Sequence, residues 1–421
     1  MHELDSHRFA VQRVVAAVVT HDPDPPRPPL RRGTLTALAG VLVAALALGA
    51  TAAYGLFTGN AWTDATDPDA ILQERDTGAR YVFLPADGRL HPVLNYTSGL
   101  LLTRGDRPRL RTVRAEKLAE VPLGEPLGIP GAPDSLPAVA DLLTGQWSVC
   151  VAATETTLLV GSPPTGGSEP DGLLVRDGSG RTQLIAGGRR FALPERAQRA
   201  LGWFGERPWP APAAWTDAVP PGPEMAPPVI PDTGTPSVIA GRPVGQVLTD
   251  GNQFAVVLRD GIAPLTPVQA RLLGSAVTIG AEFRSLPASA RRLPPDRLPP
   301  RIPRLSAGPS SAGPASACVT LAGDNSHALV RVDATFPKGV RPAGPSPVDR
   351  VHVGRGRGAL VSPAGDTVHL VTDAGMRFEL AGRELLGRLG YPKVPPLRVP
   401  ERLVRYLPAG PALDPIRAGR A

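Results

Sequence analysis

Two cysteines, Cys150 and Cys318, are the residues of this 421-residue chain that could form a covalent link. The stretches around them, 147–151 and 317–321, are short apolar runs typical of buried strands. Two thiols are too few for a closed metal site, so two alternatives remain: a disulfide, which an oxidising compartment permits, or two free buried thiols. A disulfide would close a loop of ~170 residues and would stabilise the fold by several kcal/mol.

Nucleotide chemistry has little support in the sequence. A P-loop needs a lysine after a glycine, but none of the three lysines, Lys117, Lys338 and Lys393, follows one. The Gly-Arg-Gly-Arg-Gly stretch at 354–358 could present amides and charge to an anion, yet it lacks the full dinucleotide fingerprint. We interpret it as a turn leading into a strand at 359–361.

Hydrolytic and metal chemistry are equally unsupported. No G-x-S-x-G or H-E-x-x-H motif occurs, and no two histidines after residue 58 are spaced H-x-x-x-H. Asp324 lies near His327, but closeness in sequence does not make a catalytic triad. We therefore predict no catalytic residue, no metal site and no cofactor, and a structural role for His91. The other histidines of this part of the chain are His327, His352 and His369.

The sequence at 35–57 predicts a transmembrane helix that would anchor the rest of the chain at a membrane. This stretch has no charged residue, and as a helix of ~34 Å it could cross a hydrocarbon core of ~30 Å. A cleaved signal peptide is one alternative, since 50–52 is Ala-Thr-Ala, and a buried core helix is another. The long preceding arm and the length of the apolar run favour an uncleaved anchor.

The charges on either side of this stretch predict its orientation. Arginines precede it and aspartates follow it, at Arg27, Arg31 and Arg32 and at Asp64, Asp67 and Asp69. Because positive charge marks the cytoplasmic side, we expect 1–34 inside and 58–421 outside. The arm contains a short amphipathic helix at 7–20, which Asp22 and Pro23 should end, and then a Pro-rich linker. This helix could contact the membrane surface or a partner.

Composition indicates a folded outer domain with many turns. The chain has 51 Pro and 46 Gly, but 42% of its residues are hydrophobic and occur in short strand-like runs. The net charge is +7, with Arg scattered among acids and no basic helix interleaved with aromatic residues. This pattern is typical of a solvated mixed surface and does not indicate nucleic-acid binding.

Four stretches share a pattern of strand, glycine-containing turn, second strand and short helix. They are 81–102, 184–203, 256–274 and 370–391, with turns at Asp87-Gly88, Gly187-Gly188, Asp260-Gly261 and Ala374-Gly375. Asp-Gly and Gly-Gly favour tight hairpin turns because they tolerate positive φ. Each unit is too small to be stable alone, so we expect the repeats to pack on one another or on a common core.

The remaining apolar runs predict a central β-rich core. It would combine the cysteine strands with 157–161, 328–332 and 359–361, within regions 142–180 and 315–365. The repeat regions would lie near 80–138, 182–206, 252–290 and 368–412. Extended Pro-rich loops are expected at 208–236 and 294–314. The predicted fold class is α+β: a single N-terminal transmembrane helix, then an elongated extracytoplasmic domain with this core and four small hairpin–helix repeats.

Stretches throughout the chain match the pattern of a known family, at 21–32, 77–82, 89–95, 127–133, 147–150, 318, 370–375, 389–391 and 407–415. On these residues the chain resembles the EccB family, membrane components of type VII (ESX) secretion systems. The resemblance implies a disulfide within the central domain and a scaffold role in a membrane complex. It also implies partners: EccC-, EccD- and EccE-like subunits, other EccB copies and the cytoplasmic membrane, with export of WXG100-type proteins.

Some members of that family carry an ATPase label. This chain has no P-loop, and a domain outside the membrane would meet little ATP, so we expect a structural component rather than an enzyme. The alternatives are an ATP hydrolase and a cell-wall-binding module on a single anchor.

Overall fold

The computed structural model describes residues 2–20, 30–58, 64–105, 108–293, 297–306, 315–321, 328–363, 365 and 367–420. The chain divides into two compact units. The first comprises Met1–His91 and Arg109–Gly124, and the second comprises Pro92–Pro108 and Glu125–Ala421.

Two helices begin the first unit, α1 (His2–Thr20) and α2 (Leu30–Thr58). Helix α1 starts five residues before the predicted 7–20, and its expected stop at Asp22 and Pro23 lies outside the described residues. Helix α2 covers the whole of 35–57. Among the side chains that the structure describes, no helix is both long and apolar enough to cross a membrane.

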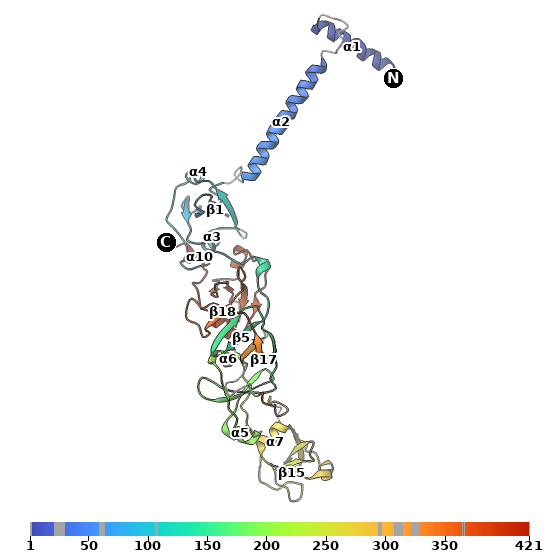
Figure 1. Ribbon diagram of the computed structural model, residues 1–421, viewed down its shortest axis with the longest axis vertical. Coiled ribbons are helices and arrows are strands. Elements are labelled where there is room, and N and C mark those ends of the chain that lie inside the picture. Colours follow the sequence, from blue (N-terminus) through green and yellow to red (C-terminus); the bar gives the residue numbers. More distant parts are fainter. Residues whose placement is uncertain are drawn as a thin grey trace. The chain divides into compact units, whose positions relative to one another are not determined.

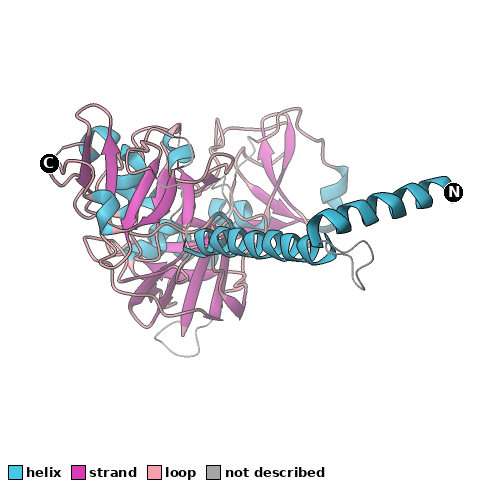
Figure 2. Ribbon diagram, turned by 90° about the horizontal axis from the view of Figure 1, so that it is seen from above, coloured by secondary structure: helices cyan, strands magenta, loops and turns pink. Residues whose placement is uncertain are grey.

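Four small sheets follow one topology, which we call a repeat. Its first strand pairs antiparallel with the second, the second forms a hairpin with the third, and a short helix leads to a fourth strand parallel to the first. Figure 2 shows strands in small groups and several short helices. This confirms a mixed α+β fold built from several small sheets.

The first repeat has β1 (Ala70–Glu74), β2 (Arg80–Leu84), β3 (Arg89–Pro92), α3 (Tyr96–Leu102) and β4 (Arg109–Val113); the second has β8 (Leu173–Arg176), β9 (Thr182–Ala186), β10 (Arg189–Ala192), α5 (Glu195–Leu201) and β11 (Trp209–Pro210). The third has β12 (Val247–Thr249), β13 (Phe254–Leu258), β14 (Gly261–Leu265), α7 (Pro267–Leu273) and β15 (Ala276–Thr278); the fourth has β19 (Ala359–Ser362), β20 (His369–Val371), β21 (Arg377–Glu379), α8 (Leu385–Arg388) and β22 (Leu397–Arg398).

The structure corrects two details of the predicted repeats. The strand at 359–361 was expected in the central core, but β19 pairs Leu360 with Leu370 and Val361 with Leu397, so it belongs to the fourth repeat. Every residue of β19 is buried, and a short apolar run does not reveal which sheet it joins. In the third hairpin Leu258 pairs with Gly261, so the turn is Arg259-Asp260 and not Asp260-Gly261.

The fifth sheet is central and carries the cysteines. Its strand order is β18-β6-β5-β16-β17-β7, with Cys150 directly opposite Cys318 on antiparallel neighbours. The expected strands at 157–161 and 328–332 fall within or overlap β6 and β17. The bounds are β5 (Trp147–Ala152), β6 (Glu155–Leu159), β7 (Thr165–Ser168), β16 (Ser316–Leu321), β17 (Ala328–Thr335) and β18 (Arg350–His352).

One large apolar core joins the central sheet to its neighbours. Val149, Val151 and Val319 from one face of the sheet belong to it, together with residues of the second and fourth repeats. Two tryptophans of this core, Trp209 and Trp215, meet edge to face with ring centroids 5.2 Å apart. Short helices complete the fold: α4 (Ala115–Leu118), α6 (Ala213–Ala218), α9 (Glu401–Arg405) and α10 (Pro415–Ala418), with 3-10 turns at Val139–Asp141 and Gly280–Ser285.

The helices of the repeats pack in pairs within the second unit. Helix α5 of the second repeat lies beside α7 of the third, and Val268 and Leu272 of α7 enter the second repeat's core (Figure 1). Helix α3 contacts α8 and α10, which come from the opposite end of the chain. Within the second unit, these helix contacts cover apolar residues that such small elements could not bury alone.

Candidate functional site: a crosslinked sheet and four strand clamps

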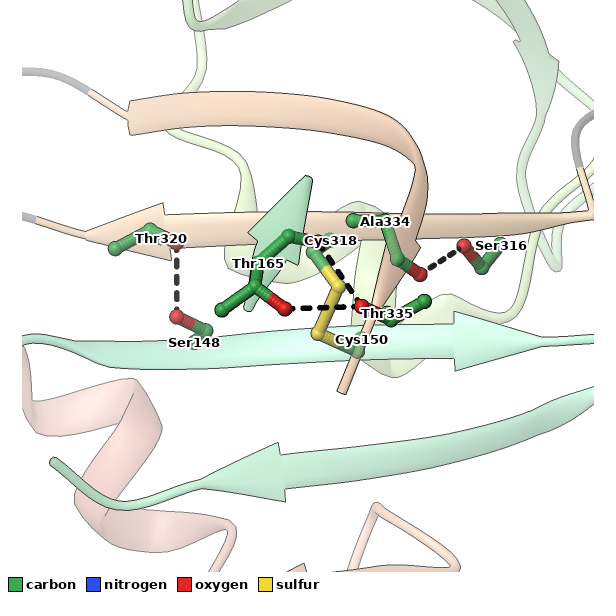
Figure 3. Close-up of a disulfide and its surroundings, with 8 residues drawn as sticks. All are labelled: Ser148, Cys150, Thr165, Ser316, Cys318, Thr320, Ala334 and Thr335. Atoms are coloured by element: carbon green, nitrogen blue, oxygen red, sulfur yellow. Dashed lines mark hydrogen bonds between the residues drawn. A yellow bond between two sulfur atoms is a disulfide. The ribbon is translucent and has the colours of Figure 1, made fainter. Parts of the chain in front are cut away.

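Cys150 and Cys318 form a disulfide with an S–S distance of 2.07 Å and a Cα–Cα distance of 4.0 Å (Figure 3). Both residues are fully buried. The disulfide alternative is confirmed, and the alternative of two free thiols is wrong. Because both sulfurs are bonded and shielded from solvent, this pair supplies no thiolate for nucleophilic or metal chemistry. Its role is to link β5 to β16.

The disulfide lies on the less apolar face of the central sheet. Alternate residues of a strand point to opposite faces, so Ser148 and Cys150 share the face away from the large core. The buried apolar cluster here is small, consisting of Cys150, Leu159, Cys318 and Ala334, with Phe336 packed against it. The covalent link therefore holds the two central strands together where apolar packing contributes least.

Hydroxyl groups continue the cross-strand contacts on either side of the disulfide. The hydroxyls of Ser148 and Thr320 hydrogen-bond at 2.8 Å, and those of Thr165 and Thr335 at 2.9 Å (Figure 3). Ser316 Oγ donates to the carbonyl of Ala334 at 2.6 Å. Ser148, Thr320 and Ser316 are buried, so their bonds satisfy polar groups that would otherwise be costly, whereas the Thr165–Thr335 pair is exposed.

The third strand of every repeat is clamped on its outer edge by a later segment of the chain. One residue of the strand donates its N–H to the carbonyl of a proline in that segment. The carbonyl of the same strand residue accepts an N–H from the residue two positions after the proline. In the fourth repeat Arg377 N donates to Pro408 O at 3.0 Å, and Gly410 N donates to Arg377 O at 2.8 Å. The other clamps are Leu90 with Pro122 and Gly124, Arg190 with Pro220 and Gly222, and Ile262 with Pro287 and Ser289.

A ring and a glycine meet in three of these clamps. The strand residue after the clamped one is His91, Phe191 or Phe378. A β-carbon added to the facing glycine would lie very close to the nearest ring atom, at 2.3 Å for Gly124, 2.5 Å for Gly222 and 2.2 Å for Gly410. In the third repeat the equivalent residue is the small Ala263, and the clamp residue is Ser289. The missed signal was visible in the sequence, as Val/Leu-Pro-x-Gly/Ser at 121–124, 219–222, 286–289 and 407–410.

The described histidines after residue 58 lie on three different strands. His91 Nε2 lies 2.9 Å from Asp87 Oδ2 in the first repeat, His352 is on β18, and His369 is buried on β20. Burial lowers the pKa of His369, and nearby Arg377 lowers it further, while Glu379 opposes this. His327 and Asp324 lie outside the described residues. Within the described ranges, no cluster of three or more His, Cys, Asp or Glu could hold a metal ion.

The Gly-Arg stretch at 354–358 forms the expected turn into β19. The amide of Gly356 donates to the carboxylate of Asp373 at 2.8 Å, and Arg357 N donates to Gly354 O at 3.0 Å. The amide that an anion would need is therefore already bonded to a carboxylate of the same chain.

The whole chain, residues 1–421, matches the family described as "Type VII secretion system ESX-1, transport TM domain B". The chain belongs to the EccB family. One relative of this EccB-family chain, the "ESX-3 secretion system ATPase EccB3" of Mycolicibacterium smegmatis, is 28% identical, with 98% of this chain and 89% of the relative covered. The "ESX-2 secretion system ATPase EccB2" of Mycobacterium tuberculosis is 32% identical over 74% of this chain and 64% of that protein.

Solved structures resemble the EccB-family chain over most of its length. A chain in the structure of an intact ESX-5 inner membrane complex matches with a TM-score of 0.74 and 27% identity, covering 99% of this chain and 94% of that one. The structure of an EccB3 dimer from the ESX-3 core complex matches with a TM-score of 0.69 and 27% identity, covering 84% of this chain and all of the other.

Proposed function

We propose that this EccB-family chain is a structural component of a type VII secretion membrane complex, which supports export of WXG100-type proteins. The observation that carries the proposal is the match over 99% of the chain to a component of an ESX-5 inner membrane complex. What the described residues build also suits a scaffold. They form a crosslinked sheet, and repeats within the second unit pack on one another.

We propose further that residues 35–57 anchor the chain in the cytoplasmic membrane in a single pass, with 1–34 inside and the 58–421 domain outside. Several observations support this topology. The backbone is helical from Leu30 to Thr58, and the leucines and valines described between 38 and 48 are exposed. Arginines precede the stretch and aspartates follow it. The buried disulfide fits an oxidising compartment outside the membrane.

The proposed partners are other copies of the chain and EccC-, EccD- and EccE-like subunits. The support comes from relatives: one solved structure is an EccB3 dimer, and another is an intact ESX-5 inner membrane complex. In this arrangement the arm at 1–34 meets cytoplasmic or membrane partners, and the outer repeats and crosslinked core mediate assembly above the membrane.

Affinity purification tests the proposal. The tagged full chain, solubilised from its own membrane in mild detergent, is expected to copurify with a motor-type ATPase and a multi-span subunit. Recovery of the chain alone, under conditions that retain other membrane complexes, would overturn the proposal. A chain that lacks residues 1–57, purified in the same way, should lose the membrane subunits if the anchor carries those contacts.

The relatives' names include the word ATPase, so the same preparation should be assayed for ATP turnover. We expect the isolated chain to show none, because it has no P-loop lysine. Hydrolysis that survives removal of all partner subunits would contradict a purely structural role.

A further inference from the structure

Two clefts of the second unit meet at Val229, whose side chain is 86% exposed. The first cleft has a volume of about 610 Å³ and lies along the proline-rich segment 221–229, opposite Leu298. The second has a volume of about 540 Å³ and is lined by Val238, Leu258 and Leu293. Val238 is also 65% exposed. Adjacent apolar side chains left in water are typical of a surface that a partner covers.

Arginines surround these apolar walls. Arg189 and Arg297 line the first cleft, and Arg259, Arg291 and Arg292 line the second. Arg292 and Arg297 are exposed and form no ion pair with any described residue. Guanidinium groups bind carboxylates in a forked geometry, so such a rim favours an acidic ligand.

The acidic side chains of the clefts do not cancel this charge, because each already has a partner. Glu224 pairs with Arg196 at 2.7 Å, and Asp232 pairs with Arg259 at 3.4 Å. Asp260 accepts hydrogen bonds from Ser289 Oγ at 2.6 Å and from Ala290 N at 3.0 Å. Arg292 and Arg297, which pair with no described acid, can therefore meet negative charge from outside.

The backbone along the first cleft limits how a ligand can bind. Prolines stand at 221, 223, 227 and 228, and proline has no N–H to donate. A ligand therefore cannot add as a regular β-strand to this segment, and side-chain contacts must hold it. An anionic polymer without apolar groups would leave Val229, Val238 and the proline rings uncovered.

We infer that the two clefts are a docking surface for an acidic, extended peptide segment of another protein, one that carries apolar residues among its carboxylates. The apolar residues would fill the clefts on either side of Val229, and the carboxylates would meet the arginine rim. The inference goes beyond the proposed scaffold role and does not depend on it, because it uses only the second and third repeats and the segments that border them.

The test uses the full chain in detergent and a fluorescein-labelled synthetic peptide in which Glu alternates with Val, with fluorescence anisotropy as the readout. The double variant Arg292→Glu/Arg297→Glu should bind about tenfold more weakly or worse, since both charges reverse. The matched control Arg383→Glu/Arg398→Glu makes the same charge change in the fourth repeat and should bind like the parent. Equal losses in both variants, or no loss in either, would overturn the inference.

A second pair of measurements tests the apolar requirement. A peptide of alternating Glu and Ser should bind several-fold more weakly than the Glu–Val peptide, and Val229→Ser should reduce that difference. If the Glu–Ser peptide or inorganic polyphosphate binds as tightly as the Glu–Val peptide, the surface is a general polyanion site and the peptide inference fails. Because all substituted residues are exposed, loss of folding should not obscure the result.

Discussion

The ring of Phe378 occupies the space that a side chain at Gly410 would need. A β-carbon added at Gly410 would lie 2.2 Å from Phe378 Cε1, far inside van der Waals contact. Phe378 is 3% exposed, so its ring has little room to move away. The same relationship recurs between Phe191 and Gly222 and between His91 and Gly124, although these residues are far apart in the chain.

Gly410→Ala should therefore destabilise the protein by about 1–3 kcal/mol, the usual cost of overpacking a core. Denaturant unfolding would measure this. The control Gly205→Ala places its methyl group in open space and should leave stability unchanged or slightly raised. In the Phe378→Ala background, Gly410→Ala should cost much less, since the ring is gone; an unchanged cost would show that the ring is not the obstacle.

Replacing both cysteines, as Cys150→Ala/Cys318→Ala, should lower the free energy of unfolding by up to about 5 kcal/mol, because the crosslink spans 168 residues. Thermal unfolding with and without a reducing agent measures the effect. The reductant should destabilise the parent once its disulfide opens and should leave the double variant unaffected. Equal melting temperatures for the oxidised parent and the variant would contradict a stabilising role for the link.

His369 should make stability depend on pH. Its pKa in the folded protein is lowered by burial, so the unfolded chain binds a proton more readily than the folded one. Stability should be constant above the unfolded value near 6.5, and should fall as the pH drops from there towards the lowered folded pKa. The Nδ1 atom of His369 is buried without a hydrogen-bond partner among the described residues.

The variant His369→Phe removes this titration. As the pH falls below 6.5, the free energy of unfolding of the parent should decrease more than that of the variant. Parallel curves for the parent and His369→Phe would mean that His369 is not the titrating group.

Tyr391→Phe should destabilise the second unit by about 1–3 kcal/mol, because the Tyr391 hydroxyl donates to the carbonyl of Pro137 at 2.7 Å and that buried acceptor would lose its partner. Burial raises the pKa of this hydroxyl, so it remains a donor at neutral pH. Tyr406→Phe, which breaks a bond to Ala214 O, should have a similar effect. Tyr81→Phe is the control, since no hydrogen bond joins the Tyr81 hydroxyl to a described residue.

The hairpins could be predicted because their chemistry is local. Gly187 and Gly188 both have positive φ between the paired residues Ala186 and Arg189, which is what the Gly-Gly turn requires. The cysteine strands could also be predicted from their apolar runs. These features depend only on residues close together in the sequence.

The parts of the repeats that could not be predicted from the sequence depend on contacts between distant residues. Strands β1, β8, β12 and β19 pair in parallel with strands that follow a helix, and nothing in a short apolar run identifies such a partner. The strand clamps were missed for a different reason. Pro-Ala-Gly at 408–410 has the composition of an ordinary loop. A glycine is needed at 410, however, because the ring of Phe378, more than thirty residues earlier, leaves no room for a side chain.

The packing of α3 against α8 and α10 has a consequence for the order of folding. Arg388 Nη1 donates to the carbonyl of Leu101 at 3.1 Å, a contact across 287 positions of the chain. Ribosomes make proteins from the N-terminus, so the segment around Leu101 must wait until nearly the last residues have been synthesised before it finds its partner. Until then its apolar residues are uncovered. A chain that stops before α8 would therefore leave the apolar residues of α3 uncovered and open to proteases and chaperones.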